Sequence, residues 1–149
     1  MEVFMAYRIT NTCSGCTACV RLCPVTAISG ERKAVHIINP SLCIDCGACG
    51  RICPQDAVED SREIACRHIH KLSQWPKPVI DIPKCVSCRI CIEGCPVHCL
   101  ELKSNGKDKH EHPALEEPKL CISCGFCAMD CPVEAIRLDV PSQSAVEAK

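Results

Sequence analysis

Cysteine is the residue type in this sequence whose number and spacing could do chemistry. The chain has 149 residues, of which 18 are cysteine. Sixteen of them fall in four runs of one form, C-x2-C-x2-C-x3-C-P, which read CSGCTACVRLCP, CIDCGACGRICP, CVSCRICIEGCP and CISCGFCAMDCP from Cys13, Cys43, Cys85 and Cys121. Because thiolates are soft ligands for iron, zinc and copper, this repetition predicts metal binding.

The spacing within each run favours an iron–sulfur cube. Three cysteines two residues apart lie on a tightly coiled loop and can point at three corners of one cube. The proline after the fourth cysteine fixes φ and prevents the preceding turn from continuing, so that the fourth cysteine faces a neighbouring cube. This run is the bacterial [4Fe–4S] ligand pattern, in which the fourth cysteine ligates the other cluster of a pair. The four runs therefore predict four [4Fe–4S] clusters.

Two other uses of cysteine fit less well. A zinc site needs four ligands in a closed tetrahedron, which leaves the third cysteine and the Cys-Pro pair of every run unexplained. Disulfides need an oxidising compartment. The first ten residues, MEVFMAYRIT, include Glu2 and Arg8 and lack the apolar core of an export signal.

Charge and hydropathy limit the location and the partners. No apolar run approaches the roughly 20 residues that cross a membrane, so we expect no membrane span and a cytoplasmic location. The formal net charge is −1, which gives no basic surface for nucleic acid.

The longest interval between runs, residues 54–84, divides the chain. It contains a helix-like stretch, Arg62–Leu72, followed by the helix-breaking sequence Trp75–Pro78. We predict a first two-cluster module over residues 1–60, a linker with a helix over 61–77, a second module over 78–140 and a C-terminal tail over 141–149. A hydrophobic core alone is marginal for a module of about 60 residues, so cluster binding must contribute folding energy.

The local pattern predicts short strands and short helices around the runs. Strands are expected at Ala6–Thr10, Ala34–Ile38, Val79–Ile82 and Ile136–Val140. A short helix is expected after each Cys-Pro pair, as at Val25–Ile28.

With both pairs of runs in view, residues Tyr7–Val58 and Ile80–Leu138 each resemble a bacterial two-cluster ferredoxin domain. The resemblance implies an α+β fold with two tandem ferredoxin-like modules. Each module would have pseudo-twofold symmetry, with two short hairpins beside two short helices around its clusters. The whole chain resembles a four-cluster ferredoxin-type subunit of a larger redox enzyme.

The resemblance also implies which cysteines share a cluster. The sets are Cys13, Cys16, Cys19 and Cys53 for cluster 1; Cys43, Cys46, Cys49 and Cys23 for cluster 2; Cys85, Cys88, Cys91 and Cys131 for cluster 3; and Cys121, Cys124, Cys127 and Cys95 for cluster 4. Related dehydrogenase subunits show an interleaved pairing instead, in which the first run shares with the fourth and the second with the third. The interval over residues 24–42 resembles that of a sequential two-cluster domain, so we favour the sequential pairing.

Departures from the pattern occur in the third run and after it. Lys103–Glu117 is an insertion in the second module. Arg89 follows the second cysteine where two other runs have glycine, and a cation there would raise the potential of a cluster unless solvent screens it. Cys99 stands where the other runs have alanine. We interpret Cys99 as a buried inert thiol, with a substitute ligand or redox thiol as the alternative, and Cys66 as a packed or surface thiol.

The resemblance implies one-electron transfer through four clusters, with no substrate site and hence no enzyme activity in this chain. The expected partner is a larger catalytic subunit of the hydrogenase, formate dehydrogenase, or tungsten or molybdenum oxidoreductase type, together with a flavin subunit or a soluble ferredoxin. A free soluble polyferredoxin that shuttles between enzymes is one alternative. The other is a self-associating assembly subunit that links redox enzymes into arrays.

Overall fold

The chain forms two compact units, and each contains two of the cysteine runs. The structure is a computed structural model that describes residues 6–104, 106 and 109–141. Unit 1 is Met1–His70 and unit 2 is Lys71–Lys149. The segment 61–77, predicted as a linker, is thus divided between the two units, and residues 142–149 of the predicted tail lie outside the described residues.

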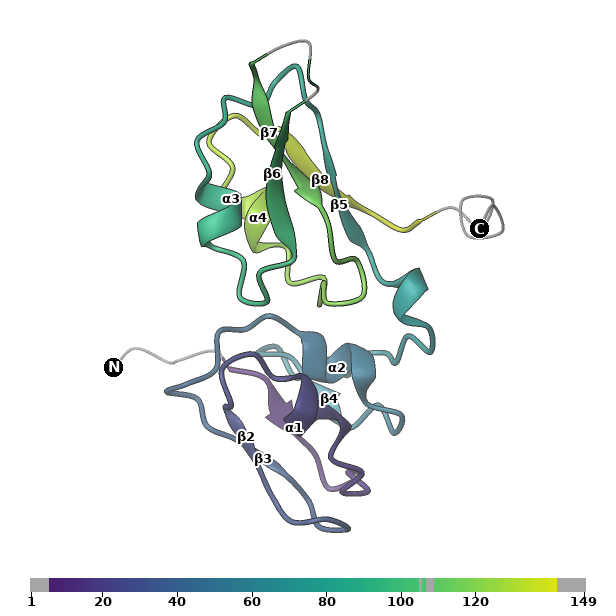
Figure 1. The fold of residues 1–149 in the computed structure, drawn as a ribbon. Helices are drawn as coiled ribbons and strands as arrows, with labels where there is room; N and C mark the ends of the chain where they lie inside the picture. The colour runs from purple at the N-terminus through teal and green to yellow at the C-terminus, as the bar shows by residue number, and fades with distance from the viewer. Residues whose placement is uncertain (1–5, 105, 107–108, 142–149) are drawn as a thin grey trace. The chain divides into compact units, whose positions relative to one another are not determined.

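Unit 1 is built from short helices and two-residue strands. In chain order it contains β1 (Arg8–Ile9), α1 (Ala18–Leu22), β2 (Ile28–Ser29), β3 (Ile37–Ile38), α2 (Ala48–Ile52) and β4 (Val58–Glu59), as Figure 1 shows. The strands pair antiparallel, the first with the last and the middle two with each other. The registers are Ile9 opposite Val58 and Ile28 opposite Ile38.

Unit 2 repeats this order with longer strands (Figure 1). After a 3-10 helix (Leu72–Gln74), its elements are β5 (Lys77–Ile80), α3 (Ile90–Glu93), β6 (Leu100–Ser104), β7 (Glu111–Leu115), α4 (Phe126–Met129) and β8 (Ile136–Asp139). β5 pairs with β8 and β6 with β7, all antiparallel. Within the described part of the chain, no helix is long and apolar enough to cross a bilayer.

The four predicted strands are confirmed, since each predicted range contains or overlaps a strand. They correspond to β1, β3, β5 and β8. The predicted insertion lengthens the β6–β7 hairpin, in which Leu100 lies opposite Leu115 and Ser104 opposite Glu111.

The helices predicted after each Cys-Pro pair are wrong, because the helices come before the proline. α1 ends at Leu22, and Cys23 is already extended at φ −61° and ψ 116°. A residue that precedes proline avoids the helical region, and proline has no N–H to continue the ladder. The segment Val25–Ile28 instead turns through Thr26, at φ 53°, into β2.

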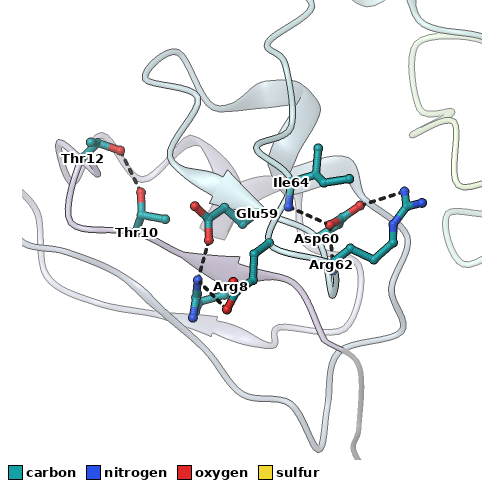
Figure 2. Close-up of polar contacts among 8 residues, drawn as sticks. Arg8, Thr10, Thr12, Glu59, Asp60, Arg62 and Ile64 are labelled. Atoms are coloured by element: carbon teal, nitrogen blue, oxygen red, sulfur yellow. Dashed lines mark hydrogen bonds and ion pairs between the residues drawn. The ribbon is translucent and has the colours of Figure 1, made fainter.

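The helix predicted within Arg62–Leu72 is also wrong. In Figure 2 the carboxylate of Asp60, which follows β4, accepts hydrogen bonds from the backbone N–H groups of Arg62 (2.9 Å) and Ile64 (3.0 Å). These bonds, with that from Ile64 as the first cause, lower the pKa of Asp60. A side chain that binds nearby backbone N–H groups offers the chain an alternative to a helix. The chain therefore folds back, and Ala65 forms a β-bridge with Glu59.

The backbone of every cysteine run takes the left-handed conformation at the same three places. These are two residues after the first cysteine, one after the second and three after the fourth: Gly15, Thr17 and Thr26; Asp45, Gly47 and Asp56; Ser87, Arg89 and His98; Ser123, Gly125 and Glu134. Residues other than glycine pay roughly 1–2 kcal/mol in that region. Four runs that repeat one strained path form four loops of the same shape.

Gly15 adds a close approach to this conformation. A Cβ built on Gly15 would lie 2.5 Å from the backbone nitrogens of Lys33 and Ala34. The loop of the first run thus lies directly against the turn between β2 and β3, and the Lys33 N–H donates to the Gly15 carbonyl (3.1 Å).

We expect Gly15→Ala to deplete the first of the four clusters, because backbone cannot yield at 2.5 Å and the hairpin must move away from the loop. The matched control is Gly106→Ala, since Gly106 is also left-handed (φ +71°) but a Cβ there meets nothing within 4 Å. Iron and acid-labile sulfide per chain measure the effect after anaerobic purification. Equal iron in the two variants would contradict the prediction.

Cysteine side chains contribute to the buried core of both units and form most of the main buried cluster in unit 2. One cluster of buried side chains in unit 1 contains Cys19, Ile28 and Ile38. In unit 2 the corresponding cluster contains Leu100 and Ile136 together with Cys91, Cys95, Cys99 and Cys121. Helices of four or five residues are too short to be stable without tertiary support. A metal group bound by the cysteines must therefore stabilise the fold.

Candidate iron–sulfur cluster sites

Four cavities, two in each unit, gather the predicted ligands. Each cavity is lined by the first three cysteines of one run and the fourth cysteine of the other run in the same unit. The first is lined by Cys13, Cys16, Cys19 and Cys53; the second by Cys43, Cys46, Cys49 and Cys23; the third by Cys85, Cys88, Cys91 and Cys131; and the fourth by Cys121, Cys124, Cys127 and Cys95. All sixteen predicted site residues thus meet in four sets of four.

The four cavities are alike in size and lining. The empty volume is about 320 Å³ for the first cavity, about 340 Å³ for the second and about 330 Å³ for each of the third and fourth. Apolar side chains complete the walls, such as Ile28 and Ile38 in the second cavity and Leu100 and Leu138 in the fourth. Within residues 6–104, 106 and 109–141 no three His, Cys, Asp or Glu side chains converge on a single metal ion position. Four thiols around an apolar cavity fit a cube with four iron corners.

The local backbone structure fixes the position from which each ligand sulfur enters its cavity. The third cysteine of every run is the second residue of a helix, and the fourth cysteine follows soon after that helix ends. The sulfurs also accept backbone hydrogen bonds: Gly15 N–H donates to Cys13 Sγ (3.4 Å) and Ala27 N–H to Cys23 Sγ (3.3 Å). The same bonds recur from Ala57 to Cys53 (3.4 Å) and from Ala135 to Cys131 (3.3 Å). Donors to sulfur are one of the levers by which a protein sets a cluster's potential.

The buried thiols hold their protons tightly until a metal replaces them. Burial, followed by the neighbouring sulfurs, raises the pKa of Cys19 to about 11 and the pKa values of Cys49 and Cys127 to about 12. A ligating thiol must be deprotonated, and the metal cation supplies the free energy for that. Cluster assembly therefore releases protons.

Cys99 lines the fourth cavity together with the four predicted ligands. It is buried, as predicted, and its Sγ lies 3.5 Å from Cys95 Sγ. A hydrogen bond with Cys121, followed by burial, raises the pKa of Cys99. The interpretation of Cys99 as an inert thiol stays a prediction.

Cys66 is half-buried and packs against α2, since a Cβ on Gly50 would lie 2.4 Å from Cys66 Cβ. Burial, followed by the charge of Asp60, raises the pKa of Cys66. Cys66 lines none of the four cavities that hold the predicted ligands.

Arg89 lines the third cavity, but its guanidinium is paired. Arg89 Nη2 lies 3.4 Å from Glu111 Oε2, and both side chains are more than half exposed. A solvated ion pair is screened, so its effect on a cluster potential stays a prediction.

Reasoning from the sequence did not identify His36, which lies at one of these sites. It is 1% exposed and lines the first cavity. The signal for it was a single polar residue in the apolar strand segment Ala34–Ile38.

Comparisons with known proteins identify two cluster-binding domains in the chain. Residues 12–58 match a family described as "4Fe-4S dicluster domain", and residues 84–135 match a second family with the same description. One of the subunits of the ion-translocating oxidoreductase complex, from three strains of Haemophilus influenzae, is 50% identical over 36 residues, which are 24% of this chain and 19% of the relative.

One solved structure aligns at a TM-score of 0.35 and 25% identity, over 85% of this chain and 52% of its own. It is the formate dehydrogenase–heterodisulfide reductase–formylmethanofuran dehydrogenase complex from Methanospirillum hungatei. This chain therefore spans about a fifth of the length of the curated relatives that it matches, and about half of the chain in that complex.

Proposed function

We propose that this chain relays single electrons as a subunit of a larger oxidoreductase. The basis is that it carries two 4Fe-4S dicluster domains in tandem and holds four [4Fe–4S] clusters. Electron transfer is the function of such domains. The observation that carries the proposal is the set of four cavities of similar size, each lined by four predicted ligands. The proposal includes the absence of a substrate site in this chain.

The ligands of each cluster, in this proposal, are the four cysteines of the runs that line each cavity; Cys99, which also lines the fourth cavity, is not one of them. Cys23, Cys53, Cys95 and Cys131 each cross to the cluster of the other run in the same unit. The proposal also includes pseudo-twofold symmetry within each unit, which is supported by the repeated left-handed positions and by the strand pairing.

A [4Fe–4S] cluster, when bound, takes up and returns one electron. The residues of the chain hold it and set its environment. Apolar side chains such as Ile38 and Leu100 exclude water from the cavities, and backbone N–H groups donate to ligand sulfurs, as Ala27 does to Cys23. Neither task requires the fold to move, which keeps the reorganisation that accompanies electron transfer small.

The role within a larger complex has two supports. Four clusters in one chain suit a relay between fixed donors and acceptors, and the curated relatives are named as part of an oxidoreductase complex. The partner in this proposal is a catalytic redox subunit, with a flavin subunit or a soluble ferredoxin at the other end of the relay. None of the eighteen cysteines, all of which the structure describes, forms a disulfide, as suits the reducing cytoplasm that we propose as the location.

The test is a coulometric titration of the anaerobically purified chain, with iron and acid-labile sulfide measured on the same sample. We expect about 16 iron atoms and about 16 sulfides per chain, from four [4Fe–4S] cubes. The uptake should be about four electrons, one per cube. Zinc in place of iron, or protein with scarcely any sulfide, would overturn the proposal. Co-purification with a larger redox subunit separates membership of a complex from the role of a free carrier.

A further inference from the structure

The side chain of His36 is held at the wall of the first cavity with its ring almost entirely cut off from solvent. Its Nδ1 lies 3.0 Å from the carbonyl oxygen of Ala34 and 3.8 Å from Cys13 Sγ. A carbonyl oxygen can only accept a hydrogen bond, so Nδ1 carries the proton and donates it. The proton is therefore directed at the Ala34 carbonyl, and Cys13 Sγ, which belongs to a predicted ligand of cluster 1, lies near the same N–H as a second and more distant acceptor.

The other nitrogen of the ring, Nε2, is buried and has no hydrogen-bond partner in the part of the chain that the structure describes. A buried polar atom without a partner costs roughly 1–3 kcal/mol relative to a paired one. An apolar side chain of similar size would fill this position without that cost. The imidazole is thus poorly suited to a role in packing alone, and its donor beside Cys13 is the property that an apolar residue lacks.

Gly30 fixes the ring from the opposite side of the hairpin. A Cβ built on Gly30 would lie 2.7 Å from both Cγ and Cδ2 of His36. Only a glycine leaves room for the ring at this place, and the Ala34 carbonyl holds its Nδ1 edge. The two contacts together set the direction in which the N–H points.

The second unit lacks this donor at the equivalent position. In unit 1, His36 lies two residues before Ile38, which pairs with Ile28. In unit 2, the residue two before Leu115, which pairs with Leu100, is Pro113. Pro113 lines the third cavity as His36 lines the first. Proline offers neither a backbone N–H nor a polar side chain.

We propose that His36 is a positioning residue for electron transfer: its Nδ1–H is shared between the Ala34 carbonyl and, more weakly, the Cys13 thiolate, and so raises the reduction potential of cluster 1. Reduction adds negative charge to the cluster and its sulfurs, and a donor to one of those sulfurs stabilises the reduced state more than the oxidised state. Cluster 3, with Pro113 at the matching position, lacks this stabilisation. The inference rests on the proposed function, because it takes Cys13 as a cluster ligand.

The test compares two substitutions of the same shape, one with a donor and one without. His36→Asn keeps an N–H donor near the position of Nδ1, whereas His36→Leu removes it. In a potentiometric titration followed by EPR, His36→Leu should move one of the four one-electron steps to a more negative potential by about tenfold in its equilibrium constant, or about 59 mV. His36→Asn should leave that step close to its original potential.

The control is His112→Phe. His112 is also buried, and its Nδ1 also has no hydrogen-bond partner among the described residues. However, Pro113 rather than His112 is among the residues that line the third cavity. Removing His112 should therefore shift none of the four potentials, although it removes a buried imidazole in the same way.

Every outcome of this test either supports or overturns the proposed role of His36. Suppose that iron and sulfide show four clusters in His36→Leu and that all four potentials are unchanged. That result overturns the role of His36 and leaves the proposed function intact. An equal shift in His36→Asn overturns the hydrogen bond as the cause. If His36→Leu does not retain four clusters, His36→Phe, which keeps a planar ring, provides the same measurement. Wild-type protein without iron would instead overturn the proposed function itself.

Discussion

Removal of iron by an anaerobic chelator unfolds both units of the chain. The expected result follows from how little else holds them: helices of four or five residues, strands of two to five, and a core in which cysteine is prominent. Because no preformed site exists in an unfolded chain, the binding free energy of the clusters becomes folding free energy. Far-UV circular dichroism and the dispersion of amide NMR signals, recorded as iron leaves, should lose their folded character together.

The control for this experiment is the same chelator saturated with iron before it is added, which should leave the spectra unchanged. Both units should respond, because each has two cavities of the same kind. An iron-free chain that keeps dispersed amide signals in either unit would show that the packing of that unit is sufficient without clusters.

Replacement of the fourth cysteine of a run removes one cluster. The three cysteines that become reactive in that variant identify the run with which the replaced cysteine shares its cluster. In Cys23→Ala we expect the loss of cluster 2, because Cys23 lines the second cavity with Cys43, Cys46 and Cys49. Iron should fall by about a quarter, one cube of four. Native anaerobic alkylation with peptide mapping should then modify Cys43, Cys46 and Cys49 far faster than in wild-type protein, since thiolates that leave a cluster become available.

The matched control is Cys66→Ala, because Cys66 lies in the same unit but lines none of the four cavities. That variant should keep its full iron content and its alkylation pattern. Under the interleaved pairing, Cys23→Ala would expose Cys121, Cys124 and Cys127 in unit 2 instead. Such a result would show that the proposed ligand sets are wrong even though the number of clusters is right.

The sequence by itself determined the cofactor and its number. A cluster ligand set is a local pattern, since three of its four cysteines lie within seven consecutive residues, and no distant contact can change that spacing. The same locality made the strand predictions succeed: Ile136–Asp139, for example, alternates apolar and charged residues (IRLD) and needs only one partner strand. The division into two modules followed from the long interval between the second and third runs.

Only the tertiary structure decided which elements surround the clusters and which side chains reach them. The expected helix after Arg62 is absent because the Asp60 carboxylate binds the backbone of Arg62 and Ile64. His36 reaches the first cavity through the β2–β3 hairpin, which brings it next to Gly30 and beside Cys13, 23 positions earlier in the chain. The physical reason is that these arrangements depend on contacts between segments that one-dimensional spacing does not encode.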